Sequence, residues 1–291
     1  MLLLLDKILL TEMNLKNLIT RTLSGAVYVA LIVLGIMTVE WAFVAFCALF
    51  TLLATREFIL MTKPGGSKIN LSIDIAFAVG LVLLFTIASA QAVKGLEPSV
   101  SILLILPYML VRLISQLYNK EENPIKSIAY SVFSQCYIVI PMMLMPMLLD
   151  ISNTFLLLIF VMIWMNDTGA FLVGCTIGKH RLFERISPKK SWEGFWGGMF
   201  FCVMTGVGYY YLIPEVPATI NSLPFFIILG IIVSVFATFG DLVESMFKRS
   251  VGVKDSGNLI PGHGGILDRI DSLLFVIPAV AFYLVIQFLF A

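Results

Sequence analysis

The chain has 291 residues, of which 59% are hydrophobic and 13% charged, with a net charge of +1 and a mean hydropathy of +0.99. Soluble domains carry roughly 25% charged residues, so this composition excludes an ordinary soluble globular protein. The sequence contains no basic stripe or nucleic-acid-binding motif, which excludes DNA or RNA as an expected partner. We therefore expect an all-α polytopic membrane protein.

The first ten residues form an apolar run that is too short to span a bilayer, and no cationic region precedes it as in a cleaved signal peptide. Met13 opens a more ordinary cytoplasmic lead-in and offers an alternative start. Beyond it, nine apolar segments are each long enough to cross a hydrocarbon core of about 30 Å. They run over 23–39, 41–61, 71–92, 99–118, 126–149, 153–177, 194–213, 223–247 and 271–290.

The distribution of Lys and Arg predicts the orientation. When the nine segments alternate across the bilayer, all of the 19 Lys and Arg residues except Lys94 fall on the side of the N-terminus. Because basic loops stay in the cytoplasm, we expect the N-terminus inside and the C-terminus outside. The two longest polar loops, 178–193 and 248–270, fall on the cytoplasmic side and would surround a polar funnel in an integral plasma or inner membrane.

We divide the chain into two parts. Residues 1–150 contain the first five spans, which we expect to act as scaffold and to admit lipid. Residues 151–291 contain the last four spans and both long loops, and we expect them to be catalytic. The polar residues that could carry chemistry gather in this second part, at 164–169, 187–194 and 241–271.

Carboxylates and basic residues in this second part have informative spacings. Asp241, Glu244 and Lys248 share one helical face, and Asp268 and Asp271 lie three apart at the opening of the last span. Converging carboxylates would repel each other unless cations bind, and hard oxygen ligands suit Mg²⁺. Neighbouring Lys and Arg suit phosphate, and a glycine-rich loop lets backbone N–H groups approach an anion. The combination predicts metal-assisted phosphoryl or nucleotidyl transfer.

Simpler interpretations remain open for single features. Asp241 and Glu244 could merely pair with the basic residues that follow them. Lys189 and Lys190 could anchor the topology by touching anionic headgroups. His263 could be a loop histidine without a catalytic role. A lone carboxylate inside an apolar helix at residue 167 is harder to dismiss, because it costs about 2.5–3.5 kcal/mol on insertion scales.

Other patterns favour packing over chemistry. The cysteines lie in apolar segments without CxxC spacing, which indicates small buried side chains and not a zinc site or disulfide frame. They are Cys47, Cys136, Cys175 and Cys202. The Gly194–Gly198 spacing is typical of close helix packing and is weak evidence for a dimer. A Walker-like run over 174–180 is one residue short and follows a membrane helix, so we reject it.

The run from Ser245 to Asp271 resembles the signature of the CDP-diacylglycerol synthase (phosphatidate cytidylyltransferase) family. The pattern is Ser-x-hydrophobic-Lys-Arg, four residues, Lys-Asp, a small residue, then Pro-x-His-Gly-Gly-hydrophobic-x-Asp-Arg-hydrophobic-Asp. Every fixed position is present: Ser245, Lys248, Arg249, Lys254, Asp255, Gly257, Ile260, Pro261, His263, Gly264, Gly265, Asp268, Arg269 and Asp271. Segments 166–170, 178–179 and 187–194 are also similar to that family. The resemblance covers about 160–271, and the first five spans match only in being apolar.

The resemblance implies that CTP and phosphatidic acid give CDP-diacylglycerol and pyrophosphate, a reaction of phospholipid biosynthesis. It also implies a nucleotidyltransferase that depends on Mg²⁺, with a second cation as an option, and that forms a homodimer. Both reactants are anionic, so the main barrier is electrostatic. The lipid phosphate is itself a nucleophile, and no protein nucleophile is needed.

On this interpretation the catalytic carboxylates are Asp241, Asp268, Asp271 and Asp167. We expect Asp241 and Asp268 to hold the metal, with the other two as further ligands or supporting groups. The expected substrate-binding residues are Ser187, Lys189, Lys190, Glu193, Lys248, Arg249, Lys254, His263, Gly264 and Gly265.

Two alternatives remain, one with related chemistry and one from a different class of protein. A CTP-dependent polyprenol or phytol kinase also combines membrane helices with basic loops, but the complete signature favours the synthase. A cation-coupled transporter could use a site at Asp167 and Asp241. A transport pathway should be lined with polar groups through the depth of the bilayer, however, and here they gather at one side.

Overall fold

The computed structural model describes residues 22–38, 40–63, 68–89, 103–213, 217, 220–260 and 264–290. His263 and residues 1–21, with the alternative start at Met13, lie outside this described part. The helices are Thr22–Met37, α2 (Glu40–Thr62), α3 (Lys68–Ser89), α5 (Ile105–Leu117), α6 (Pro124–Ser134), the π-helical turn η1 (Gln135–Val139), α7 (Ile140–Leu149), α8 (Asn153–Ile177), α9 (Trp192–Leu212), α10 (Leu223–Ser250) and α11 (Leu267–Phe290). Within the described residues, each of the nine predicted segments falls on a helix or on the continuous run α6–η1–α7.

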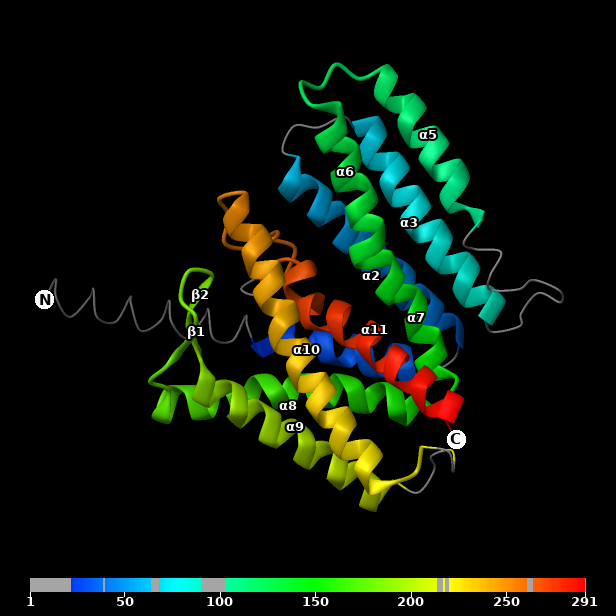
Figure 1. Cartoon of the computed structure of the whole chain (residues 1–291). Coiled ribbons are helices and arrows are strands. Elements are labelled where there is room, and N and C mark those ends of the chain that lie inside the picture. The colour runs from blue at the N-terminus through cyan, green and yellow to red at the C-terminus, as the bar shows by residue number, and fades with distance from the viewer. Residues whose placement is uncertain are drawn as a thin grey trace, which may run out of the picture.

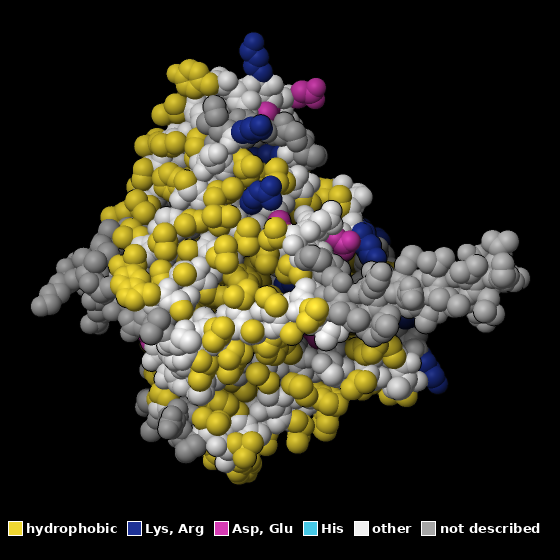
Figure 2. All heavy atoms as spheres, turned by 180° about the vertical axis from the view of Figure 1, so that it is seen from behind, with side chains coloured by type: hydrophobic (Ala, Val, Ile, Leu, Met, Phe, Trp, Pro, Cys, Tyr) yellow, Lys and Arg dark blue, Asp and Glu magenta, His cyan; other side chains and the backbone are white. Residues whose placement is uncertain are grey.

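The expected membrane class agrees with the length and composition of these helices. Six helical stretches in the described residues are long and apolar enough to cross a membrane: Trp41–Thr62, Asn70–Ala88, Pro124–Pro146, Asn153–Ile177, Leu223–Ser250 and Leu267–Leu289. Helix Thr22–Met37 and α5 are shorter, and α9 is rich in glycine and tyrosine. The fold is thus all-α with at least six candidate spans, and the prediction of about nine spans is confirmed only in part. Figure 2 shows hydrophobic side chains over most of one face of the molecule.

The helices form two groups that meet at α11 (Figure 1). In the first group α8 and α9 lie side by side, and α10 packs on α9 and on α11. In the second group α3 packs between α2 and α5, and α6 continues through η1 into α7. Helix α11 also packs against α7 and α2, so α11 stands where the two groups touch.

Glycines bring α8 and α9 into close contact. A Cβ on Gly194 would lie 2.8 Å from the carbonyl oxygen of Ala170, and one on Gly198 would lie 2.7 Å from Oδ1 of Asn166. Real side chains do not approach so closely, so these positions admit only glycine without a shift of backbone. The Gly194–Gly198 spacing therefore serves helix packing within the chain, as one of the two sequence-based interpretations held.

A polar network is buried among α3, α5 and α6. Arg112 and Asp74 are both fully buried, with Nε of the arginine 3.4 Å from Oδ1 of the aspartate. Tyr108 and Ser131 donate hydrogen bonds to the two Asp74 oxygens at 2.9 and 2.7 Å. Arg112 also donates to Gln116 at 2.8 Å. The topology count placed Arg112 on the cytoplasmic side, and the structure shows it buried as an internal link between helices.

The loop that follows α8 contains a small antiparallel hairpin, which the all-α prediction did not include. Strand β1 (Arg181–Phe183) pairs with β2 (Ser187–Ser191), with Arg181 opposite Ser191 and Phe183 opposite Ser187. Ser191 ends the second strand and caps α9, because its hydroxyl accepts the backbone N–H of Gly194 at 3.1 Å. The cap fixes the hairpin relative to α9.

Candidate active site

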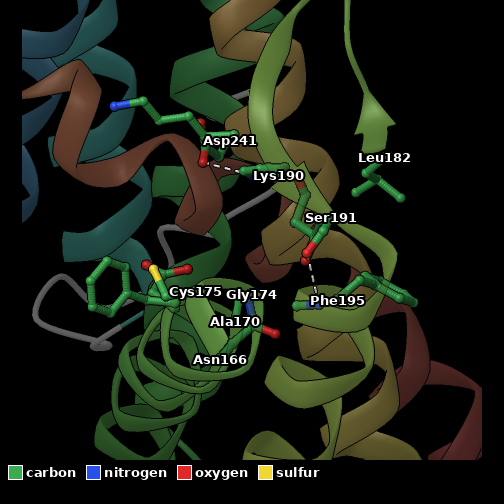
Figure 3. Close-up of a pocket in the computed structure, with 14 residues that line it drawn as sticks. Asn166, Ala170, Gly174, Cys175, Leu182, Lys190, Ser191, Phe195 and Asp241 are labelled. Atoms are coloured by element: carbon green, nitrogen blue, oxygen red, sulfur yellow. Dashed lines mark hydrogen bonds and ion pairs between the residues drawn. The ribbon is translucent and has the colours of Figure 1, made fainter. Parts of the chain in front are cut away.

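A cavity of about 330 Å³ opens between α8, β2, α9 and α10, and we call it the α8–α9 cavity (Figure 3). Its polar lining includes Asp167 from α8, Lys189 and Lys190 from β2, and Asp241 from α10. Leu182, Phe195 and Phe171 are among its apolar walls. Four of the predicted site residues thus come together from three elements that are distant in sequence.

Lys190 and Asp241 form an ion pair at this cavity. The Lys190 ammonium lies 2.7 Å from Oδ2 of Asp241, and the two side chains are 26% and 39% exposed. Ser245 donates to the other oxygen, Oδ1, at 3.2 Å. The sequence left open a simple pairing of Asp241 with Lys248 or Arg249, but in the structure Asp241 pairs with Lys190 of the hairpin. Lys190 thus faces a carboxylate of the cavity, and whether it also touches lipid headgroups stays an open interpretation.

The hairpin is held at its base by Glu193. This carboxylate accepts the backbone N–H groups of Lys179 and His180 at 3.1 and 3.2 Å, and it lies 2.6 Å from Nδ1 of His180. Hydrogen bonds from its own backbone N–H and from His180 lower the pKa of Glu193 to about 2. Glu193 therefore stays ionised and shapes the hairpin that carries the lysines.

A second cavity of about 290 Å³ lies between helix Thr22–Met37, α8 and the start of α11, and we call it the α11 cavity. Asp167 lines this cavity as well as the first one. Asp271 and Arg269 line it from α11, and Tyr28 lines it from the N-terminal helix. The two cavities thus share one carboxylate, and the second is lined by one arginine, Arg269, and by three acids, Asp167, Asp268 and Asp271.

Asp268 lies at the centre of a hydrogen-bonded cluster, which we call the Asp268 cluster. Its Oδ1 accepts from Lys248 at 2.6 Å. Its Oδ2 accepts from the backbone N–H groups of Ser256 and Gly265 at 2.9 and 2.8 Å, and from the Ser256 hydroxyl at 3.0 Å. Lys248 also forms an ion pair with Glu244, as one sequence interpretation held. Both carboxylate oxygens of Asp268 are therefore engaged by the protein itself.

The remaining predicted site residues lie elsewhere. Lys248, which we expected to bind substrate, is nearly buried between Glu244 and Asp268. The backbone N–H of Gly265 points to Asp268, and Gly264 has a φ of 83° that favours glycine. Arg249 and Lys254 are exposed and line neither of the two cavities. Ser187 pairs within the hairpin, and His263 lies outside the described residues.

Several groups near the site were not among the predicted site residues, although Asn166 lies in one of the segments that the sequence singled out. Asn166 is buried and accepts from Ser234 at 2.7 Å, which fixes α8 against α10 next to Asp167. Cys175 lines the α8–α9 cavity and is exposed, contrary to the expectation that all four cysteines pack inside, and Cys136 is exposed too. Glu57 of α2 contacts the Asp268 cluster. A charge inside an apolar segment was the available signal for Glu57.

The carboxylates of the cavities fit a divalent cation in part. Asp167 and Asp241 face one cavity, and carboxylate oxygens are the ligands that Mg²⁺ prefers. Asp268 has four donors on its two oxygens, so binding a cation there would require Lys248 to move away. No group of three or more His, Cys, Asp or Glu side chains in metal-binding proximity occurs in the described part of the chain.

The helices and the cavities define an all-α integral membrane protein. Its polar site combines acidic and basic side chains with apolar walls. Comparison with known proteins narrows this class. A model of the Cytidylyltransferase family matches residues 19–287. The chain belongs to this family, as the signature at its C-terminal end predicted.

Three relatives show the extent of the similarity, and each of them is named phosphatidate cytidylyltransferase. The phosphatidate cytidylyltransferase of Bacillus subtilis is 31% identical over 286 residues, which is 92% of this chain and 97% of that protein. The phosphatidate cytidylyltransferase of Staphylococcus aureus is 40% identical over 162 residues, or 55% of this chain and 60% of that protein. That of Staphylococcus epidermidis is 37% identical over 161 residues, with the same shares. The matched stretch thus spans about three fifths of the staphylococcal proteins and nearly all of the Bacillus protein.

Proposed function

We propose that this protein is a phosphatidate cytidylyltransferase, which converts CTP and phosphatidic acid to CDP-diacylglycerol and pyrophosphate. The observation that carries the proposal is the α8–α9 cavity, where Lys189 and Lys190 face Asp167 and Asp241. Lysines suit phosphate, and the acids suit a cation that accompanies a nucleotide. The 97% coverage of the Bacillus relative supports the same reaction.

The reaction joins the lipid phosphate to the nucleotide. A phosphatidate oxygen attacks the α-phosphorus of CTP, one P–O bond forms, and the bond from the α-phosphorus to the bridging oxygen of pyrophosphate breaks. The nucleotide would occupy the α8–α9 cavity, with its phosphates at Lys189 and Lys190. The lipid phosphate would reach the α11 cavity, where Arg269 can neutralise it. Asp167 stands at both cavities, next to the place where the two phosphates would meet.

The apolar surroundings of the α11 cavity support this assignment of the lipid. Helix Thr22–Met37 borders the cavity and carries exposed Leu23, Val27 and Leu31 on its outer surface. Acyl chains can lie along such a surface while the phosphate reaches inward. The first five spans would then do what the sequence predicted and admit lipid.

A Mg²⁺ ion is the cofactor that we propose. Asp241 and Asp167 would hold it. Asp271 could be a further ligand, and Asp268 could be one after Lys248 has moved away from it. Such an ion supplies positive charge that screens the repulsion between two anionic substrates and stabilises the leaving pyrophosphate. When Asp241 binds the ion, Lys190 would lose this carboxylate as its partner and could bind the phosphates of the nucleotide.

The orientation also stays a proposal. Basic residues still gather on the side of the N-terminus when Arg112 is left out of the count, which supports a cytoplasmic site, an inside N-terminus and an outside C-terminus. CTP is available on that side. The nine-span topology stays part of this proposal. The homodimer also stays a prediction, although the Gly194–Gly198 spacing no longer supports it because those glycines pack against α8.

One assay tests the activity. Purified protein in detergent receives phosphatidic acid, CTP labelled at the α-phosphate and Mg²⁺, and label is counted in the lipid phase. We expect a labelled CDP-lipid that disappears with EDTA and in Asp241→Asn. Label from γ-labelled CTP in a polyprenol would instead support the kinase, and no transfer from either nucleotide would overturn both enzyme assignments.

A further inference from the structure

Glu57 is a buried carboxylate in the half of the chain that we expected to be scaffold. It lies in α2 and is 5% exposed. Its Oε2 accepts the backbone N–H of Leu267 at 2.9 Å and the hydroxyl of Ser256 at 3.2 Å. Its other oxygen, Oε1, has no hydrogen-bond partner in the described structure. A carboxylate is costly in such surroundings, so its two hydrogen bonds have to matter to the fold.

The first of these bonds fixes the beginning of a helix. Leu267 is the first residue of α11, where backbone N–H groups have no partner within the helix. A negative charge near such an N-terminus also interacts favourably with the helix dipole. Glu57 thus caps α11 from a distant helix. It supplies the hydrogen-bond acceptor that a residue just before the helix usually supplies.

The second bond reaches the Asp268 cluster. The Ser256 hydroxyl stands between two carboxylates, 3.2 Å from Oε2 of Glu57 and 3.0 Å from Oδ2 of Asp268. The backbone N–H of Ser256 donates to Asp268 as well, at 2.9 Å. Glu57 is therefore linked to Asp268 in two ways. Ser256 hydrogen-bonds to both carboxylates, and Leu267, which donates to Glu57, directly precedes Asp268 in the chain.

Two glycines of the signature make room for this carboxylate. A Cβ on Gly257 would lie 2.8 Å from Oε1 of Glu57, and a Cβ on Gly265 would collide with Oε2. We call residues 255–260 and 264–266 the signature loop, and its backbone packs against Glu57 at these two glycines. Tyr28 adds an independent contact from the N-terminal half, because its hydroxyl donates to the carbonyl oxygen of Arg269 at 2.9 Å.

From these contacts we propose that Glu57 is a positioning residue, which holds the signature loop and the first turn of α11 so that Asp268 and Asp271 face the site. It acts as a hydrogen-bond acceptor for Leu267 and Ser256. The first five spans would then contribute directly to the geometry of the site, beyond scaffold and lipid access.

The test compares Glu57→Met with Glu57→Gln. Methionine is of similar size but accepts no strong hydrogen bond, whereas the amide oxygen of glutamine can still accept from Leu267 and Ser256. Arg56→Gln is the matched control, because Arg56 is the exposed neighbour on the same turn. Amide hydrogen exchange of the peptide over 264–270 reports the positioning without any assay of activity.

We expect faster exchange in this peptide for Glu57→Met and exchange close to wild type for Glu57→Gln and Arg56→Gln. Wild-type exchange in the methionine variant would overturn the proposal. So would a glutamine variant that exchanges as fast as the methionine variant, because the charge and not the acceptor would then matter. If Glu57→Met does not accumulate as folded protein, Ser256→Ala tests the same link from its other end, with faster exchange expected.

The kinetic arm rests on the proposed function. We expect Glu57→Met to lower kcat by about 10–100-fold, the range seen when residues that support a site are lost. The KM for CTP should stay near wild type, because Glu57 does not line the α8–α9 cavity. A loss confined to KM would overturn the positioning role. If wild-type protein transfers no cytidylyl group at all, the proposed function fails while the exchange result still decides the role of Glu57.

Discussion

The ammonium of Lys190 lies 2.7 Å from Oδ2 of Asp241, and this ion pair links β2 to α10 at the α8–α9 cavity. An incoming nucleotide phosphate would compete with Asp241 for the lysine. An accompanying cation would compete with Lys190 for the carboxylate. The pair therefore resembles a resting arrangement in which each residue neutralises the other until substrate arrives.

This relationship predicts strong coupling between the two residues. We expect Asp241→Asn to reduce turnover by at least about 100-fold, because it removes a carboxylate that we propose to hold the Mg²⁺ ion beside the reacting phosphates. Lys190→Ala should raise the KM for CTP. In the double variant the losses should be less than additive by about 0.5–3 kcal/mol, as found for residues in contact. Steady-state kinetics of the four proteins measure this, and strictly additive losses would show that the ion pair has no role in the reaction.

Asp268→Asn separates charge from hydrogen bonding in the Asp268 cluster. The asparagine oxygen can still accept the N–H groups of Ser256 and Gly265, so the loop should remain folded. Because asparagine is neutral, Lys248 would keep only one of its two carboxylate partners, Glu244. We expect turnover to fall by about 100-fold or more, while the elution profile in detergent stays that of wild type. Activity like that of wild type would remove Asp268 from the reaction.

The low pKa of Glu193 predicts a pH dependence of the hairpin. The folded structure lowers this pKa from 4.5 to about 2, so folding favours the carboxylate form. The contribution to stability is complete above pH 4.5 and is lost as the pH falls toward 2. At neutral pH it is fully present.

Limited digestion with pepsin between pH 4.5 and 2 measures this effect. We expect cleavage within 178–193 to increase as the pH falls in the wild type, relative to cleavage elsewhere in the chain. In Glu193→Gln the same segment should already be sensitive at the upper end of the range. Equal pH profiles for the two proteins would contradict the hydrogen-bonding role of Glu193.

Cys175 provides a chemical probe of the α8–α9 cavity. Its side chain is exposed and lines the cavity, whereas Cys47 and Cys202 are buried. We expect a thiol-alkylating reagent to inhibit the proposed cytidylyl transfer and CTP to slow the inhibition. Cys175→Ser should be active and resistant. Inhibition that persists in Cys175→Ser would point to Cys136, the other exposed cysteine in the described part of the chain.

The sequence predicted the helical class and most of the helix positions, because long apolar segments carry a strong signal even without tertiary information. It also identified the family from its charged signature. Asp167, Asp241 and the lysines at 189 and 190 do meet in one cavity. Local spacing was a poorer guide to partners, since Asp241 pairs with a lysine of the hairpin and not with the one on its own helix.

Contacts between distant segments explain what the sequence could not predict. Lys248 looked like a phosphate ligand because it belongs to a basic run, but α11 brings Asp268 against it. Gly265 looked like an anion-binding glycine, but its N–H has an internal carboxylate as acceptor. The hairpin and the role of Glu57 depend in the same way on packing that no short pattern encodes.

The buried pair of Asp74 and Arg112 has a consequence for biosynthesis of the protein. An arginine in the middle of a short apolar helix costs about 2.5–3.5 kcal/mol when that helix enters a bilayer alone. Asp74 precedes it in the chain, so α3 can already be in place when α5 emerges from the ribosome. Insertion of α5 would then be completed by docking to α3, and the charges of Asp74 and Arg112 would be neutralised together in that step.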